Sequence, residues 1–227
     1  MRVFIGYDPR EAKAADTAAI SLYRVSGITP EFLDADRLRA VGLLTRPADH
    51  RGGQDYDFPS QAPASTRFAV SRFLTPILCQ SGPALFVDCD VVFLRDPRDM
   101  PVFAPEHAVA VVKHDHRPTE AYKMVNQKQT TYPRKNWSSV MLFNCDHPAN
   151  RRLSLRDVNE RPGRDLHAFY WLADDEIGEL GPEWNWLVDV EPKPDNLGIA
   201  HMTLGGPWLP GWTGGSFDRE WKEAADG

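Results

Sequence analysis

Short apolar runs alternate with stretches of helical spacing along the first two thirds of the chain. Apolar runs that contain β-branched residues and are bounded by turn residues predict strands. They lie at residues 3–5, 30–33, 85–93, 108–112 and 140–143. Helical spacing predicts helices over residues 10–24 and 65–79. Residues 45–64 carry Pro, Gly, Asp and Gln without a clear period, so we expect a loop there.

This order of elements predicts an α/β protein with a layered sheet. No linker or repeat divides the chain, and we expect one domain over residues 1–227. The last 45 residues are rich in turns and aromatic side chains, which suits a wall over a site better than a domain. In sheets of this class, ligands bind beyond the carboxyl ends of the strands.

The run at 85–93 contains two acids, Asp88 and Asp90, at spacing i, i+2. On a strand both side chains would point to the same face. Two adjacent carboxylates repel each other unless a cation lies between them or one is protonated. Acids at the end of a buried strand are costly, which favours a metal or catalytic role. The alternative is an edge strand whose two acids are solvated.

Charge and cysteine content limit the class of protein. The net charge of −6 provides no basic field for nucleic acid or anionic lipid. Three widely spaced cysteines, Cys79, Cys89 and Cys145, argue against a disulfide framework or a cysteine-rich zinc site. No apolar run reaches the roughly 18 residues that span a membrane. Because a strand-like run begins at residue 2, we expect no signal peptide. We expect a cytoplasmic protein, or one bound peripherally to the inner membrane.

Several segments together resemble one known family. Residues 67–76 followed by 86–92 are similar to the helix and Asp-x-Asp strand of family 8 glycosyltransferases and their bacterial relatives. Residues 5–8, 136–144 and 201–208 are similar to further segments of that family, in the same order. The resemblance implies a GT-A fold, an α/β/α sandwich with a central mixed, mostly parallel sheet. It also implies sugar transfer with retention.

The resemblance assigns a metal to Asp88, Asp90 and His201, with Mn²⁺ or Mg²⁺ as the ion. A cation there would stabilise the charge on a departing sugar diphosphate, and an imidazole favours Mn²⁺. Without the resemblance, His201 could be a hydrogen-bonded histidine beside a turn. The nucleotide-binding residues that the resemblance implies are Gly6, Tyr7, Asp8, Arg72, Asp88, Gly205, Gly206 and Trp208. The first three, Gly6, Tyr7 and Asp8, would contact the base, and we expect Asp8 to read uracil.

Residues 1–100 would thus form the nucleotide-binding part, and 101–227 the acceptor side with a C-terminal closing segment. The resemblance places the sugar or acceptor near Asn136 and Ser139, and Trp212 is added because aromatic faces stack on sugar rings. Asp165 stands at the family's catalytic aspartate and is the first candidate for the catalytic group, with His167 as the second. Asp165 could equally be a helix N-cap. The chain departs from the family pattern at three places: Gly206 replaces a lysine, Leu166 replaces a glutamine, and Trp-Ser-Ser at residues 137–139 stands where the family has Asn-Ala-Gly. Glycines around Trp208 predict that residues 201–215 move when ligand binds.

The function that follows is transfer of a hexose from a UDP-sugar to a carbohydrate or glycoconjugate acceptor. Two alternatives stay open. A haloacid dehalogenase-type phosphohydrolase would use Asp88 as nucleophile and Asp90 as acid/base, although its motif normally opens the chain. A non-catalytic sugar-binding relative would explain the missing lysine and glutamine.

Overall fold

The structure is a computed structural model that describes residues 1–47, 49–51, 54–114, 122–123, 127–128, 134 and 137–226. The α-helices are α1 (Ala12–Ser26), α2 (Ala35–Ala40), α3 (Thr75–Cys79), α4 (Leu155–Glu160), α5 (Gly163–His167) and α6 (Asp218–Ala225). The strands of the main sheet are β1 (Arg2–Tyr7), β2 (Glu31–Asp34), β6 (Pro83–Val87), β8 (Val109–Val111), β11 (Val140–Asn144) and β12 (Ile177–Glu179). The other strands are β3 (Asp49–Arg51), β4 (Gln54–Asp57), β5 (Ala62–Pro63), β7 (Val91–Phe93), β9 (Tyr122–Lys123), β10 (Gln127–Lys128), β13 (Trp186–Leu187) and β14 (Ile199–His201).

The main sheet has the order β12-β8-β11-β6-β1-β2. Strand β1 pairs in parallel with β2 and β6, and β12 pairs in parallel with β8, whereas β11 is antiparallel to both of its neighbours. The predicted α/β class with a mixed, mostly parallel sheet is therefore confirmed. The carboxyl ends of β1, β2 and β6 lie at one edge, together with the amino end of β11.

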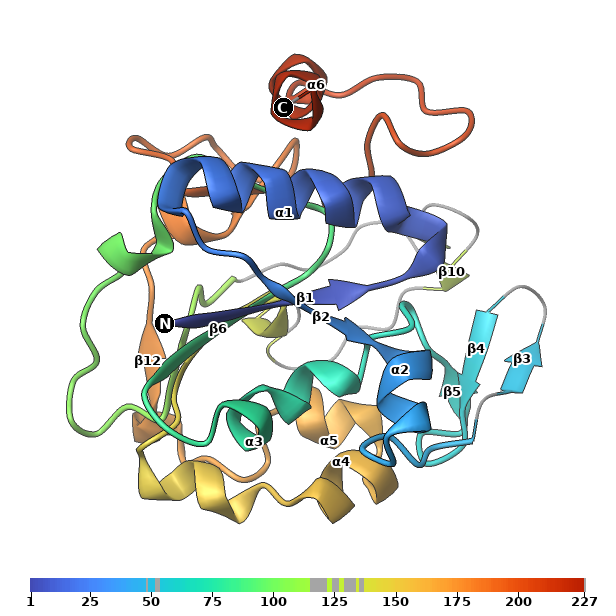
Figure 1. Cartoon of the computed structure of the whole chain (residues 1–227), viewed down its shortest axis with the longest axis vertical. Coiled ribbons are helices and arrows are strands. Elements are labelled where there is room, and N and C mark those ends of the chain that lie inside the picture. Colours follow the sequence, from blue (N-terminus) through green and yellow to red (C-terminus); the bar gives the residue numbers. More distant parts are fainter. Residues whose placement is uncertain are drawn as a thin grey trace.

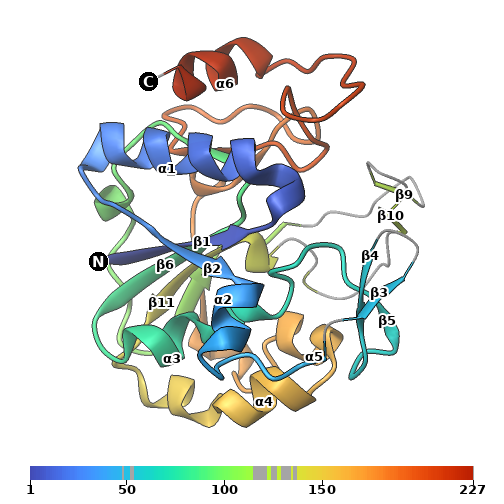
Figure 2. The same ribbon diagram turned by 45° about the vertical axis from the view of Figure 1, so that its right-hand side comes forward.

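Helices cover both faces of this sheet (Figures 1 and 2). Helix α1 lies over one face and α2 to α5 lie against the other. The buried side of α1 carries Ala14, Ala15, Ala18 and Leu22, and the small side chains allow close packing against β7 and β1. Helix α6, at the C-terminus, packs on the outside of α1.

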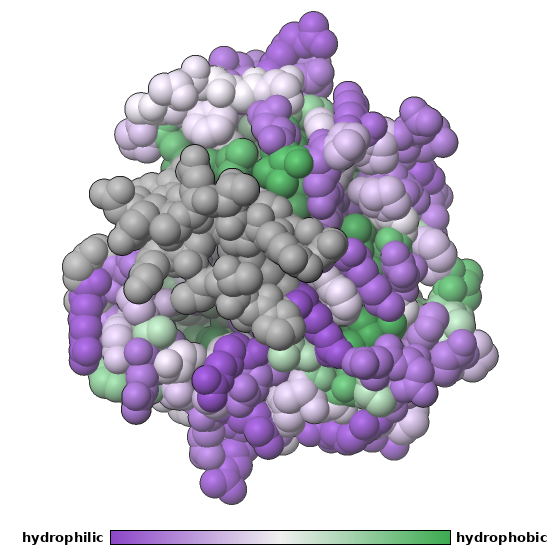
Figure 3. Space-filling model, turned by 180° about the vertical axis from the view of Figure 1, so that it is seen from behind, coloured by the Kyte–Doolittle hydropathy of each residue, from purple (hydrophilic) through white to green (hydrophobic). Residues whose placement is uncertain are grey.

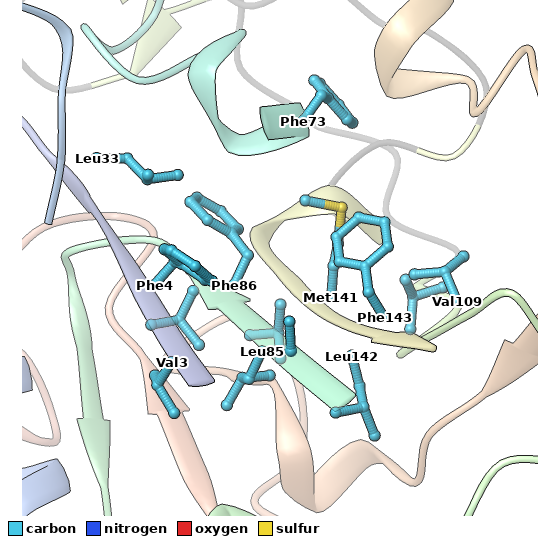
Figure 4. Packing of buried hydrophobic residues seen from close by; sticks show 14 of the residues in the cluster. Val3, Phe4, Leu33, Phe73, Leu85, Phe86, Val109, Met141, Leu142 and Phe143 are labelled. Atoms are coloured by element: carbon cyan, nitrogen blue, oxygen red, sulfur yellow. The ribbon is translucent and has the colours of Figure 1, made fainter. Parts of the chain in front are cut away.

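Side chains of the central strands alternate between the two faces (Figure 4). Phe4, Phe86 and Met141 are register partners and point to one side, toward Phe73. Val3, Leu85 and Leu142 are register partners and point to the other. Both faces are apolar because helices cover both, as is usual in parallel sheets. This explains why the strands appear in the sequence as continuous apolar runs.

The run predicted as a single strand at 85–93 is divided in two. Strand β6 ends at Val87 and β7 begins at Val91, and β7 belongs to a second sheet of order β13-β14-β7. The prediction of one continuous strand was wrong because residues 88–90 form the turn between two sheets. Asp88 and Asp90 are thus held by a turn at the carboxyl edge of the main sheet.

Two other local predictions were also wrong. The expected loop at 45–64 contains the small antiparallel sheet β3-β4-β5, whose short polar strands lack the apolar alternation that reveals a strand. The expected helix over 65–79 is a series of turns up to Val70, a 3-10 helix at Ser71–Leu74 and then α3. Pro76 sits at the first turn of α3, the position where its missing N–H costs nothing.

The described surface of the back face is mostly hydrophilic, with hydrophobic residues in small groups (Figure 3). Among the described helices, none combines the length and the apolar character that crossing a bilayer requires.

Candidate metal and nucleotide site

Three side chains from two distant parts of the chain meet at the carboxyl edge of the main sheet. One ligand atom each from Asp88, Asp90 and His201 lies within 4.8 Å of the other two. The imidazole Nε2 of His201 lies 3.3 Å from Oδ1 of Asp90. His201 is buried, whereas both carboxylates are partly exposed. The grouping predicted for a metal is therefore present in the fold.

Backbone pairing holds His201 in place. Strand β14 is antiparallel to β7, with His201 opposite Val91, and the amide of Met202 donates to the carbonyl of Asp90 at 2.8 Å. The sheet itself thus joins His201 to the acidic turn. The movement expected of residues 201–215 stays a prediction. His201, the first residue of that segment, is held in the ladder between β14 and β7.

The donor set fits a divalent cation. Two carboxylates and one imidazole suit Mn²⁺, and Mg²⁺ less well because it prefers oxygen ligands alone. The Nδ1 atom of His201 lies 3.0 Å from Oδ1 of Asn185, so Nε2 is the ring nitrogen that faces the two aspartates. A cation bound there would supply positive charge against a diphosphate.

Arg72 supports this cluster from behind. Its guanidinium lies 2.8 Å from Oδ1 of Asp88 and donates to the carbonyl of Ser138 at 2.7 Å. Arg72 is 4% exposed and its guanidinium lies over the rings of Phe68 and Phe86. The described contacts of Arg72 thus orient the carboxylate of Asp88, one of the three candidate metal ligands. The nucleotide role assigned to Arg72 stays a prediction.

A further carboxylate, Glu11, lies beside the cluster and was not predicted from the sequence. Burial, together with repulsion by Asp90 and Asp8, raises the pKa of Glu11 to about 8. The signal that could have identified Glu11 is its place three residues after Asp8, at the same edge of the sheet. The site therefore concentrates negative charge in a way that a bound cation would relieve.

We expect Glu11→Gln to stabilise the cation-free protein at alkaline pH. The folded state takes up a proton at Glu11 that the unfolded state, with the ordinary pKa of 4.5, has lost. Wild-type stability should therefore fall as pH rises from about 4.5 to about 8. The variant should match wild type near pH 4 and exceed it by roughly 2 to 4 kcal/mol at pH 9. Urea unfolding across pH in EDTA is the measurement, and a constant difference between the proteins would contradict the expectation.

The first strand ends at the predicted base-binding residues. Asp8 is fully buried and accepts hydrogen bonds from the backbone and side chain of Arg10 and from the amide of Arg67. Burial raises the pKa of Asp8, but the bonds from Arg10 and Arg67 outweigh it and leave the pKa lowered. Gly6 must be glycine because an added Cβ would lie 2.3 Å from the ring of Phe68. Tyr7 packs edge-on against Phe32.

The predicted C-terminal nucleotide residues form a tight turn beside a second hydrophobic cluster. Gly205 has a φ of 109°, which glycine tolerates best. An added Cβ on Gly206 would lie 2.1 Å from the Trp208 ring. Trp208 is buried, and its ring packs on Trp221 with centroids 5.4 Å apart. A lysine at residue 206 would therefore have to displace the Trp208 ring.

We expect Gly206→Lys to lower the free energy of unfolding by about 1 to 3 kcal/mol, because the new side chain must displace Trp208. Leu204→Lys is the matched control, since residue 204 is exposed and receives the same charge in the same segment. Denaturant unfolding followed by tryptophan fluorescence measures both. Equal stability of the two variants would show that Trp208 moves without cost.

The predicted catalytic and acceptor residues occupy different surroundings. His167 lies against Phe73, and its Nδ1 is 2.6 Å from Oγ of Ser138. Desolvation and the charge of Arg72 lower the pKa of His167 to about 3. Asp165, in α5, pairs with Arg164 at the surface. None of the described contacts joins Asp165 to the metal cluster.

The acceptor residues are spread more widely. The carbonyl of Ser139 accepts from the amide of Asp88 at 2.9 Å, which places Ser139 beside the cluster. The indole of Trp212 donates to Asp218 at the start of α6. Asn136 lies outside the described residues.

Sequence reasoning also missed a buried polar group behind His201, formed by Asn185 and His114. Asn185 lies between Trp184 and Trp186, and His114 follows β8 at the carboxyl edge of the sheet. That edge position was the available signal.

The fold and the acidic, histidine-containing site define the chain as a protein of the GT-A fold. The solved structures that it resembles include the glycosyltransferase GlyE of Streptococcus pneumoniae TIGR4, with a TM-score of 0.58, 15% identity and coverage of 99% of this chain and 59% of GlyE. LgtC gives a TM-score of 0.58 at 12% identity, over 100% of this chain and 95% of LgtC. The bifunctional glycosyltransferase WbbM gives a TM-score of 0.56 at 13% identity, over 99% of this chain and 51% of WbbM. This chain thus spans little more than half the length of GlyE and WbbM.

A closer relative in sequence is Protein CDI of Arabidopsis thaliana, which is 40% identical over 231 residues, covering 97% of this chain and 84% of that protein. The chain belongs to the family of Protein CDI. No protein-family profile matches the chain.

Proposed function

We propose that this protein is a divalent-metal-dependent glycosyltransferase. It transfers a hexose from a UDP-sugar to a carbohydrate or glycoconjugate acceptor, with retention at the anomeric carbon. The observation that carries the proposal is the meeting of Asp88, Asp90 and His201 within 4.8 Å at the carboxyl edge of a GT-A sheet.

The chemistry of a sugar diphosphate suits this edge. Negative charge develops on the diphosphate as the bond to the sugar breaks, and Mn²⁺ at the site would stabilise that charge. Asp88 and Asp90 would hold the cation, and Arg72 keeps Asp88 in place. The end of β1, at Gly6 to Asp8, lies at the same edge, and we place the base there. The backbone beside Asp8 is the proposed contact, because the Asp8 carboxylate is buried and bonded to Arg10 and Arg67.

The structural relatives are consistent with this proposal. One LgtC structure is described as a complex with donor and acceptor sugar analogues. GlyE and WbbM are both described as glycosyltransferases. The cytoplasm is the proposed location, since the three cysteines are unpaired.

The test is release of UDP. A panel of UDP-sugars is incubated with the protein and Mn²⁺, and UDP is measured with and without candidate sugar acceptors. We expect slow release of UDP from at least one donor, and none in EDTA. Stereochemistry is then read from the anomeric configuration of the product by NMR. Absence of release from every donor, with binding of UDP retained, would contradict an enzymatic role.

Binding of UDP without release from any donor would favour the second candidate function, that of a non-catalytic sugar-nucleotide-binding protein. One LgtC structure is described as an active-site variant in which glutamine is replaced by glutamate. At the position where the sequence resemblance puts the family's glutamine, this chain has Leu166, which is fully buried and offers no polar group. The phosphohydrolase alternative gains no support from the fold, because the Asp88 turn lies between β6 and β7, deep in a GT-A topology.

A further inference from the structure

A buried network of hydrogen bonds extends into the protein from the candidate metal ligand His201. Asn185 follows a 3-10 helix at Pro182–Trp184 and precedes β13, and its exposed fraction is 0%. Its Oδ1 lies 3.0 Å from Nδ1 of His201. Its Nδ2 lies 3.0 Å from Nε2 of His114 and 2.9 Å from Oγ of Ser139.

The hydrogen bond at the far end of this network determines which atoms donate and which accept along it. Nδ1 of His114 lies 2.8 Å from Oε1 of Glu191. An ionised carboxylate only accepts hydrogen bonds, so Nδ1 of His114 is the donor and Nε2 of the neutral ring is an acceptor. Asn185 must then present its NH₂ group to His114, which leaves Oδ1 for His201. An amide oxygen only accepts, so Nδ1 of His201 carries a proton.

The consequence reaches the metal cluster. In a neutral imidazole with its proton on Nδ1, Nε2 has a lone pair. That lone pair faces Oδ1 of Asp90 at 3.3 Å, so two acceptor atoms face each other across a gap that suits a cation. We infer that Asn185 is a positioning residue that fixes His201 in the Nδ1-protonated form and so presents Nε2 as a ligand for a divalent cation. The inference rests on the proposed metal-dependent function.

Asn185 also connects the two halves of the cluster. Its NH₂ group donates to Oγ of Ser139, and the carbonyl of Ser139 accepts from the amide of Asp88. The buried side chain of Asn185 thus contacts His201 directly. It is linked to Asp88 through a single residue, Ser139. Outer partners of this kind orient metal-bound histidines and tune their affinity.

The experiment compares three variants with wild type. Asn185→Leu removes the acceptor for His201. Asn185→Asp keeps an acceptor oxygen but loses the amide donors. Asn159→Leu is the matched control, because Asn159 is also a buried asparagine and bonds to residues 43, 45 and 155. Mn²⁺ affinity is measured by calorimetry without nucleotide, and thermal melts establish that each variant is folded.

We expect Asn185→Leu to weaken Mn²⁺ binding by about tenfold to a hundredfold, with Asn159→Leu unchanged. Asn185→Asp should stay within about threefold of wild type, because the acceptor at His201 is retained. Unchanged affinity in a folded Asn185→Leu protein would overturn the inference. So would an equal loss in Asn185→Asp and Asn185→Leu, which would indicate a merely structural role.

A second readout needs no metal and separates this inference from the proposed function. Long-range ¹H–¹⁵N NMR of the cation-free protein distinguishes the two imidazole tautomers, and the His201 signals are assigned by their loss in His201→Gln. We expect Nδ1–H in wild type and a shift toward Nε2–H in Asn185→Leu, where Asp90 is the remaining acceptor. If wild type binds no Mn²⁺, the proposed function fails while this readout still decides the role of Asn185. If His201 of the wild type carries its proton on Nε2, the inferred role of Asn185 is overturned.

Discussion

Asp90→Asn should abolish the cation-dependent part of UDP binding while the fold survives. The change is nearly isosteric, but it replaces a carboxylate that lies 3.3 Å from Nε2 of His201 with a neutral amide. Asp88 and His201 alone would hold a divalent cation poorly. We expect UDP affinity in Mn²⁺ to fall roughly a hundredfold, equivalent to about 2.7 kcal/mol.

Calorimetry with UDP, in Mn²⁺ and in EDTA, measures this effect. Asp99→Asn is the matched control, because Asp99 is an exposed acid on the same segment of the chain, at the end of the 3-10 helix Pro97–Asp99. The control should bind like wild type. If wild type binds UDP equally well in EDTA, the metal cluster has no part in nucleotide binding and the expectation fails.

Arg72→Met should destabilise the cation-free protein by about 3 to 5 kcal/mol, the usual cost of leaving one member of a buried ion pair without its partner. The side chains of Arg72 and Asp88 are only 5% and 15% exposed. Loss of the guanidinium also leaves the carbonyl of Ser138 without a donor that now lies at 2.7 Å. Methionine fills the space between Phe68 and Phe86, so packing changes little.

Saturating Mn²⁺ should recover part of this loss, because a bound cation compensates the charge of Asp88. Urea unfolding with and without Mn²⁺ gives both values. Arg156→Met provides the control: Arg156 pairs with Glu160 in α4 with both side chains well exposed, and such pairs contribute at most about 1 kcal/mol. If both variants lose the same free energy of unfolding, the buried pair of Arg72 and Asp88 contributes no more than an exposed pair.

Much of the scaffold could be predicted from sequence because its strands are buried on both faces. A strand covered by helices on both sides must be apolar at every position, which makes β1, β6 and β11 visible as continuous runs. The acids at 88 and 90 interrupt one such run, and their cost in an apolar setting indicates a site. The resemblance of residues 201–208 to a known family then supplied the third member, His201, from far along the chain.

The local geometry could not be predicted in the same way. Residues 88–90 form a turn between two sheets, which an apolar pattern cannot distinguish from a continuous strand. The sheet β3-β4-β5 was missed because short, polar, half-exposed strands have no alternation of buried and exposed positions. Gly206 departs from the family pattern for a reason that depends on the position of the Trp208 ring.

The sequence by itself therefore determined the α/β class, the edge at which ligands would bind and the two candidate acids, because these depend on burial period and residue chemistry, whereas His201 came from the family resemblance. The tertiary structure alone decided which polar groups support those residues. Arg72, Glu11 and Asn185 gain their relation to the cluster only when residues 11, 72, 88, 90, 185 and 201 come together. Hydrogen-bond direction and charge repulsion act over a few ångströms in space, and spacing along the chain carries no record of them.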